Sequence, residues 1–400
     1  MKKAEFFFDK FLHYFFTQAD AAFFKSLGLN CIRIAINYRY FEDQSIYTVI
    51  DMHSAPGGQS GGWHADGGTH LGNFWRHKDF QDRFVWLWTE IAERYKDNAW
   101  VAGYNILNEP ADPHPNHSGL ISLYDRTAQA IRSIDPNHIL FLDGNTFATD
   151  FTKFPEDAGT RWGSNVAFAI HDYSTYGFPK SKEKYTSSEE QRKIMRASYE
   201  RKRRWMDERG LCVWNGEWGP VYGRKEYDGE ETEEINERRY MVLRDQLEIY
   251  QKDRLSWSIW LYKDIGYQGM VFVNPDTPYR QRFQEFLLKK YRLAVDAWGT
   301  DDRNVRHIYE PITELIKTSV PDESFRKLYP PIWSLEERVT RISRTMLVAE
   351  YLVREWAELF SGLDEDELEA LAKSFAFENC GKREELNRIL QENAQAAGSV

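Results

Sequence analysis

Two kinds of hydrophobic pattern alternate along the first two thirds of the chain. Short apolar runs rich in β-branched residues are typical of buried parallel strands, and longer segments with apolar residues every three or four positions are typical of amphipathic helices. The strands predicted in this way cover residues 30–37, 46–53, 100–107, 138–143, 165–171, 211–217 and 255–261. The helices are predicted at residues 5–27, 74–96, 119–133, 187–209 and 232–252. This alternation indicates repeated βα units around one parallel sheet.

Seven strands are one short of the eight that close a TIM (β/α)8 barrel. The first connection is also short, because about eight residues separate Asn37 from Ile46, whereas a parallel crossover needs at least ~10–12 residues. We therefore predict an α/β fold of the TIM (β/α)8 type that is incomplete, with its first strand and second helix missing. An eighth ordered strand, or a helix between residues 38 and 45, would contradict this prediction.

Beyond residue 300 the pattern predicts helices without strands, at residues 303–318, 335–361, 364–376 and 382–394. Ser334 and Asp364 stand where the N-caps of two of these helices are expected. The sequence thus predicts a barrel domain over residues 1–300 and a helical C-terminal extension over residues 301–400. We expect the extension to pack on the barrel or on a partner and to carry no site residue.

The composition narrows the class of protein. Hydrophobic residues make up 42% of the 400 residues and charged residues 28%, which is typical of a globular enzyme. A net charge of -10 without a basic stripe argues against nucleic-acid binding. The aromatic fraction of 15% suits sugars, whose rings have apolar faces and polar edges, although core packing is the more frequent reason for any single ring.

The sequence also bears on the cellular compartment. No stretch approaches the ~18 apolar residues that a membrane span needs, and charged residues interrupt the phenylalanine-rich N-terminal segment, so we predict neither a span nor a signal peptide. Cys31, Cys212 and Cys380 are interpreted as small buried side chains in a reduced compartment. We therefore expect a cytoplasmic protein. The sequence makes no prediction about its oligomeric state.

Polar side chains stand at the C-terminal ends of most predicted strands. Two of them are glutamates, because Glu109 and Glu217 each follow an apolar run and each precede a proline-containing breaker. The carboxyl ends of barrel strands converge on one mouth, where ligands bind, so we expect both carboxylates there. The other side chains expected at this mouth are Arg33, His53, Asn108, His171, Tyr173 and Trp260. Each has a structural alternative, such as a buried salt bridge for the arginine or barrel packing for the tryptophan.

Paired carboxylates indicate glycoside hydrolysis with retention of configuration, for which the carboxyl groups must lie ~5–5.5 Å apart. We predict Glu109 as the acid/base and Glu217 as the nucleophile. The negative charge of the nucleophile is expected to raise the pKa of the acid. Asn108 is expected to donate a hydrogen bond to the sugar 2-hydroxyl, a contact that strengthens in the transition state.

The remaining predicted site residues have supporting roles. Arg33 and Tyr173 are expected to orient Glu217 and keep it ionised. His53 and His171 would bind sugar hydroxyls or support the acid. Trp260 would provide the surface on which the sugar ring stacks.

Five segments resemble, in the same order, motifs of glycoside hydrolase family five, the cellulase family of retaining (β/α)8 enzymes. They are CIRI at residues 31–34, IDMH at 50–53 followed by APGGQ at 55–59, LNEP at 107–110, HDY at 171–173 and NGEW at 215–218. The resemblance covers roughly residues 10–290. It implies that the eight functional positions of the family fall on the eight residues named above.

The same resemblance implies a substrate class. The motif at residues 50–59 is most similar to fungal exo-β-1,3-glucanase and β-glucosidase-like branches, which implies a β-linked glucan or glucoside as substrate and no metal or cofactor. The family's first strand and second helix have no counterpart, in agreement with the short first connection.

Two other classes of function stay open at this stage. A catalytically impaired carbohydrate-binding or interaction protein derived from a truncated glycosidase would bind a β-glucoside without cleaving a nitrophenyl β-glucoside. A metal-dependent hydrolase could use His64, Asp66 and His70, although their glycine-rich spacing matches no helix-borne ligand motif. Inactivation by a chelator would favour the metal-dependent hydrolase.

Overall fold

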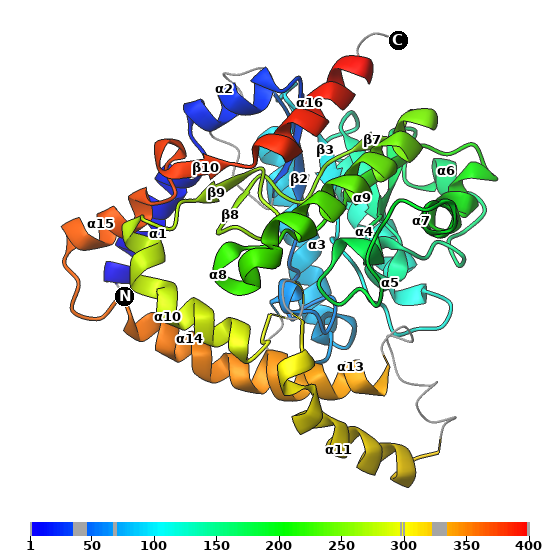
Figure 1. Cartoon of the computed structure of the whole chain (residues 1–400). Coiled ribbons are helices and arrows are strands. Elements are labelled where there is room, and N and C mark those ends of the chain that lie inside the picture. The colour runs from blue at the N-terminus through cyan, green and yellow to red at the C-terminus, as the bar shows by residue number, and fades with distance from the viewer. Residues whose placement is uncertain are drawn as a thin grey trace.

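The computed structural model describes residues 2–34, 46–66, 70–296, 298, 301–321 and 334–397. The predicted absence of a helix between residues 38 and 45 lies outside these described residues. Within them, the chain forms a curled α/β core with helices around it (Figure 1).

Seven parallel strands form one sheet in which every strand pairs with its neighbour in chain order. The strands are β1 (Cys31–Ile34), β2 (Tyr47–Asp51), β3 (Val101–Asn105), β4 (Ile139–Asp143), β5 (Val166–His171), β6 (Val213–Glu217) and β7 (Ser256–Trp257). All seven predicted strands are confirmed, each shorter than its apolar run. In the described residues no eighth strand joins β7 to β1. The prediction of an incomplete TIM-type barrel is therefore confirmed.

Amphipathic helices cover the sheet between the strands. The long ones are α3 (Lys78–Tyr95), α4 (Ser118–Arg132), α7 (Glu189–Asp207) and α9 (Thr232–Lys252). Shorter elements are η2 (Trp63–Ala65), η3 (Asn73–Trp75), α5 (Asn145–Ala148), α6 (Ala158–Arg161), η4 (Thr175–Gly177), α8 (Lys225–Asp228) and η5 (Gly229–Glu231). The apolar faces of the long helices bury Trp88, Leu123, Tyr199 and Leu243 against the sheet, which is the burial that their three- and four-residue periodicity requires.

The N-terminal helix predicted over residues 5–27 is two helices, α1 (Lys2–Phe15) and α2 (Gln18–Ser26). The break occurs at Thr17, whose backbone N–H and hydroxyl both donate to the Asp20 carboxylate at 2.8 Å in a capping box. A reciprocal cap of this kind satisfies the free backbone donors of a new helix, so the chain starts α2 there although the apolar periodicity continues.

A second, small sheet joins the segment that follows β7 to the C-terminal part of the chain. Its strands are β8 (Lys263–Asp264), β9 (Val271–Val273) and β10 (Cys380–Lys382), and β10 pairs with β9 in antiparallel orientation. The expectation of helices alone beyond residue 300 was therefore wrong, because the run of three residues in β10 is too short to give a strand pattern. The three cysteines are free, but none is fully buried as predicted, because Cys31 and Cys380 are half-buried and Cys212 is exposed.

The predicted C-terminal helices are present and follow the helix α10 (Pro278–Arg292). They are α11 (Arg303–Ser319), α13 (Leu335–Thr340), the π-helical segment η6 (Arg341–Val348), α14 (Ala349–Glu358), α15 (Glu365–Lys373), the short η7 (Phe377–Asn379) and α16 (Glu384–Ala397). Ser334 and Asp364 form the predicted capping boxes. None of the described helices combines the length and the apolar character that a bilayer span requires.

The last part of the chain packs into the barrel. Helix α15 lies against α1, and α16 lies against α9 (Figure 1). Leu386, Ile389 and Leu390 of α16 belong to the same buried cluster as Phe24 and Leu27 of the N-terminal region. The predicted domain boundary near residue 300 stays a prediction, but the C-terminal residues share the core of the first 300.

This packing makes Leu390 a measurable part of the barrel core. Leu390 is fully buried, so Leu390→Ala is expected to lower the free energy of unfolding by about 2–5 kcal/mol in urea denaturation. Glu392→Ala is a matched control on the same helix, because this exposed residue pairs with Arg388 at the surface and its loss should cost under about 1 kcal/mol. Equal effects of the two substitutions would contradict a shared core.

Candidate active site

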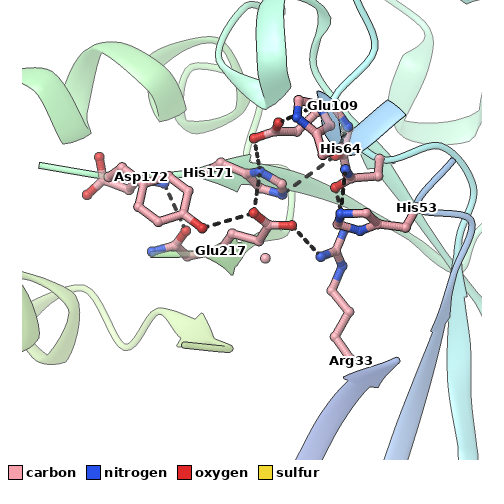
Figure 2. Close-up of polar contacts among 12 residues, drawn as sticks. Arg33, His53, His64, Glu109, His171, Asp172 and Glu217 are labelled. Carbon is pink, nitrogen blue, oxygen red and sulfur yellow. Dashed lines mark hydrogen bonds and ion pairs between the residues drawn. The ribbon is translucent and has the colours of Figure 1, made fainter. Parts of the chain in front are cut away.

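The structure brings the eight predicted site residues together at the carboxyl ends of the strands. Figure 2 shows Glu109 and Glu217 on either side of His171, with Arg33 and His53 beside them. A carboxylate oxygen of Glu109, one of Glu217 and a ring nitrogen of His171 all lie within 4.8 Å of one another. The glutamates come from positions more than 100 residues apart in the sequence, so the curl of the sheet creates this proximity.

Glu109 stands four residues beyond β3 with a backbone φ of 45°. This left-handed conformation is uncommon for a residue with a side chain and costs conformational energy. The Glu109 backbone N–H donates to Asp143 Oδ2 at 2.9 Å, and Pro110 follows directly. The hydrogen bond to Asp143 and the following proline fix the backbone at Glu109. The Glu109 side chain points towards Glu217 (Figure 2).

Glu217, the last residue of β6, receives two hydrogen bonds. Arg33 Nη1 donates to Oε1 at 2.6 Å, and the Tyr173 hydroxyl donates to Oε2 at 3.0 Å. Burial raises the pKa of Tyr173 well above its ordinary value, and the charges of Glu217 and Glu109 add to this effect, so the phenol remains a donor. The two contacts hold both oxygens of the buried carboxylate in place.

The Arg33 guanidinium is itself buried and fully paired. Its Nε donates to Asn105 Oδ1 at 2.8 Å, its Nη2 donates to Asn108 Oδ1 at 2.6 Å, and Nη2 lies 3.1 Å from Asp51 Oδ1. Burial acts to lower the pKa of Arg33, but the carboxylates of Asp51 and Glu217 outweigh it and raise the pKa. A permanently charged, geometrically fixed donor therefore faces Glu217.

Two imidazoles contact the Glu109 carboxylate. His171 Nδ1 lies 2.7 Å from Oε1, and His64 Nε2 lies 3.1 Å from Oε2. Burial raises the pKa of Glu109, but the His64 and His171 imidazoles outweigh it and lower the pKa to about 2. The predicted upward shift of this pKa is therefore wrong for the free site, because the prediction considered the repulsion by Glu217 and not the two histidines.

The proton of this cluster resides on His171. Burial lowers the pKa of His171, but Glu217, Glu109 and Asp143 outweigh it and raise the pKa to about 9. The buried His171 and the half-buried Glu109 thus form a pair that shares one proton across a 2.7 Å contact.

His53 and Trp260 form the other side of the site. Their rings stack at 5.3 Å between centroids with an interplanar angle of 13°. His53 Nδ1 lies 2.8 Å from Asp51 Oδ2, and His53 Nε2 lies 3.5 Å from Asn108 Nδ2. Trp260 is half-buried, so one face of its indole packs on His53 and part of the ring remains accessible.

Several site residues escaped the sequence prediction. Asp51 and Asp143 end β2 and β4 after the runs TVID and LFLD, the same pattern of apolar run and carboxylate that revealed Glu217. The signal was therefore present for both aspartates. Trp298, whose ring meets that of Tyr173 at 4.8 Å edge to face, follows no strand. No sequence pattern indicates a residue that a loop brings to the site.

Within the described residues, one group of three side chains has the spacing of a metal site, and it consists of the two glutamates and His171. The Arg33 guanidinium lies 2.6 Å from Glu217 and places a fixed positive charge beside this carboxylate. A cation at the same place would be repelled by that charge, so the geometry fits a paired-carboxylate site better than a metal centre.

The alternative metal ligands considered from the sequence do not converge. His64 contacts Glu109, whereas Asp66 and His70 are exposed. None of these three residues belongs to a potential metal-binding group in the part of the chain that the structure describes.

A barrel-type sheet that carries two juxtaposed glutamates at its carboxyl end defines the class of glycoside hydrolases. The profile of the cellulase family, glycosyl hydrolase family 5, matches residues 38–266. The chain belongs to this family, which confirms the resemblance found in the motifs, and it is a glycoside hydrolase.

Individual relatives refine this assignment. The chain is 60% identical to a β-xylosidase of Phanerodontia chrysosporium over 98% of the chain and 87% of that protein. The aligned stretch is 418 residues long, longer than the 400 residues of the chain, so the relative carries residues that have no counterpart here. A probable glucan 1,3-β-glucosidase A of Aspergillus fumigatus is 28% identical over 40% of the chain and 43% of that protein.

Solved structures are similar at a lower level. Endoglucanase Cel5A of Thermotoga maritima has a TM-score of 0.48 and 18% sequence identity, over 62% of this chain and 82% of that one.

Proposed function

We propose that the protein is a retaining β-glycosidase that cleaves β-linked glycosides by double displacement. The observation that carries this proposal is the proximity of the two glutamates. One carboxylate oxygen of Glu109, one of Glu217 and a ring nitrogen of His171 all lie within 4.8 Å of one another. Retaining enzymes place their carboxyl groups ~5–5.5 Å apart, whereas inverting enzymes need ~6.5–9.5 Å to admit a water molecule between sugar and base.

The first step transfers the sugar to the protein. The Glu217 carboxylate attacks the anomeric carbon, the bond to the leaving oxygen breaks, and the Glu109 carboxyl gives its proton to that oxygen. In the second step Glu109 takes a proton from water, the water oxygen attacks the anomeric carbon, and the bond to Glu217 breaks. The two inversions give net retention.

The contacts of the site support these roles. Arg33 and Tyr173 donate to Glu217, which orients the attacking carboxylate. We propose that the His171–Glu109 pair, whose ring nitrogen and carboxylate oxygen lie 2.7 Å apart, supplies the proton for the leaving group. A high pKa on Glu109 is then unnecessary, because the pair delivers one proton as a unit.

The substrate is proposed from the relatives. The β-xylosidase at 60% identity favours a β-xyloside over the β-glucoside expected from the motifs, while the more distant 1,3-β-glucosidases favour the glucoside. The two sugars differ in the hydroxymethyl group at C5, so comparison of nitrophenyl β-xyloside with nitrophenyl β-glucoside decides between them. A sugar-binding protein without catalysis would cleave neither.

The role of Glu109 can be tested through the leaving group. Glu109→Ala is expected to slow release of a phenol from an aryl β-glycoside by about 10²–10⁴-fold, because general acid catalysis contributes that much. Release of dinitrophenol, which leaves without protonation, should slow far less in the same step. Pre-steady-state and steady-state rates with the two substrates measure this difference. An equal loss with both would contradict the acid role.

A further inference from the structure

His64 lies outside the residues predicted to bind or cleave the sugar, yet it contacts Glu109 directly. Its Nε2 is 3.1 Å from Glu109 Oε2, the oxygen that His171 does not bind. The two imidazoles thus bracket the carboxylate from both sides (Figure 2). His171 ends a strand of the sheet, whereas His64 belongs to the short helix η2 in the loop after β2.

The loop leaves a space for this imidazole. A Cβ atom at Gly62 would lie 2.3 Å from His64 Cε1, so any side chain at position 62 would displace the ring. Gly62 has an ordinary extended backbone, with φ -75° and ψ 146°, and its lack of a side chain therefore matters for space and not for conformation. The Ser54 hydroxyl donates to the His64 carbonyl at 2.8 Å and fixes the backbone at the same point.

The C-terminal part of the chain contacts this loop. Arg341, the first residue of η6, donates from Nη2 to the carbonyl oxygen of Gly61. Gly61 is buried and lies three positions before His64. The C-terminal extension was expected to carry no site residue. It nevertheless contacts the loop from which His64 reaches Glu109.

The surroundings keep the His64 ring neutral near pH 7. Burial lowers its pKa from the ordinary 6.5, and nearby His53 and Arg341 add to this effect, while Glu109 and Glu217 oppose it. A neutral imidazole with its proton on Nε2 donates to Glu109 Oε2 and accepts nothing from it. Such a donor stabilises the carboxylate that remains after Glu109 gives up its proton.

We propose that His64, supported by Arg341 of the C-terminal segment, is a positioning residue for Glu109 that orients the carboxyl group and stabilises its ionised form during aglycone release. This inference rests on the proposed function, because it assigns Glu109 the acid/base role. It makes the C-terminal segment a determinant of the catalytic step as well as of folding.

The test compares His64→Phe and His64→Gln with the unaltered protein on phenyl and dinitrophenyl β-xylosides. His64→Phe is expected to slow phenol release by about 10–100-fold and dinitrophenol release by less than about 3-fold, because misplacement of an acid costs rate only where protonation is needed. His64→Gln retains an N–H donor and should restore most of the phenol rate. Loss of the donor should also move the alkaline limb of kcat/KM to higher pH, because the His171–Glu109 pair then binds its shared proton more tightly.

Arg341→Ala should reproduce the same selectivity with a smaller loss. Arg354→Ala is the matched control, because this side chain is 85% exposed and pairs only with Glu358 among the contacts found; it should leave both rates unchanged. An equal loss on both substrates with an unmoved pH profile would overturn the proposal and make His64 a structural residue.

The outcome also separates this proposal from the assignment of the acid itself. If Glu109→Ala shows the selectivity for poor leaving groups and the His64 variants do not, only the present inference fails. If the unaltered protein cleaves no aryl β-glycoside, or if Glu109→Ala shows no selectivity, the proposed function fails and this inference fails with it.

Discussion

Glu217→Ala is expected to reduce hydrolysis of a dinitrophenyl β-glycoside by about 10⁴-fold or more, as the loss of other enzyme nucleophiles does. The substitution removes the carboxylate that Arg33 and Tyr173 orient and leaves a space beside the anomeric carbon. Azide is small enough to enter that space and should restore turnover. Because azide then attacks once, from the face opposite the leaving group, the product should be the α-glycosyl azide.

The configuration of the azide product assigns the two glutamates. In Glu109→Ala the sugar is first transferred to Glu217, and azide attacks in a second inversion, so this variant should give the β-glycosyl azide. Exchanged configurations would exchange the two roles, and an inverted sugar from the unaltered protein would exclude double displacement. Glu156→Ala is a suitable control, because this carboxylate is 83% exposed and contacts Arg209 at the surface. NMR of the products distinguishes all of these cases.

Asp20→Ala is expected to lower the free energy of unfolding by about 3–5 kcal/mol, because it leaves a buried lysine without its counter-ion. Lys263 Nζ lies 2.6 Å from Asp20 Oδ1, and both side chains are fully buried. The same ammonium group donates to the carbonyl oxygens of Phe15 and Phe375. One side chain thus links the end of α1, the start of α2, the small sheet and the C-terminal region.

A double variant separates the charge from the packing. Adding Lys263→Met to Asp20→Ala removes the unpaired charge and should recover the part of the lost stability that this charge causes, since an apolar replacement of a buried ion pair is often nearly neutral. The smaller cost of losing the capping box with Thr17 should remain. Asp82→Ala breaks exposed ion pairs with Lys78 and Arg126 and should cost far less stability than Asp20→Ala. Urea denaturation measures all three proteins, and a loss in Asp20→Ala no larger than in Asp82→Ala would show that the buried pair contributes little.

The elements of the fold that depend on the local hydrophobic pattern could be predicted from the sequence. Each strand is an apolar run bounded by polar residues, and the carboxyl ends of parallel strands must meet, so the sequence alone places Glu109 and Glu217 at one mouth. The count of such runs also predicted that no eighth strand joins the sheet, as is the case in the described residues. The split at Thr17 was also readable, but the apolar period continued through it and outweighed the capping signal.

Contacts between segments far apart in the sequence could not be predicted from the sequence. The downward shift of the Glu109 pKa depends on a 3.1 Å contact with His64, and no spacing of residues reveals a distance across a loop. The pairing of β10 with β9 and the contact of Arg341 with Gly61 are of the same kind. They arise because the C-terminal segment packs back on the barrel. The helical periodicity of this segment predicts its helices but does not predict which surface they pack against.

The packing of α16 into the barrel core has a consequence for synthesis. Leu386 and Leu390 are fully buried in the cluster that also contains Phe24 and Leu27, so this cluster cannot close until the chain has been made to about residue 390. Until then, a nascent chain on the ribosome exposes that apolar surface, and such surfaces favour aggregation. Protease resistance of the barrel should therefore appear late in translation, and products that stop before α16 should depend on chaperones.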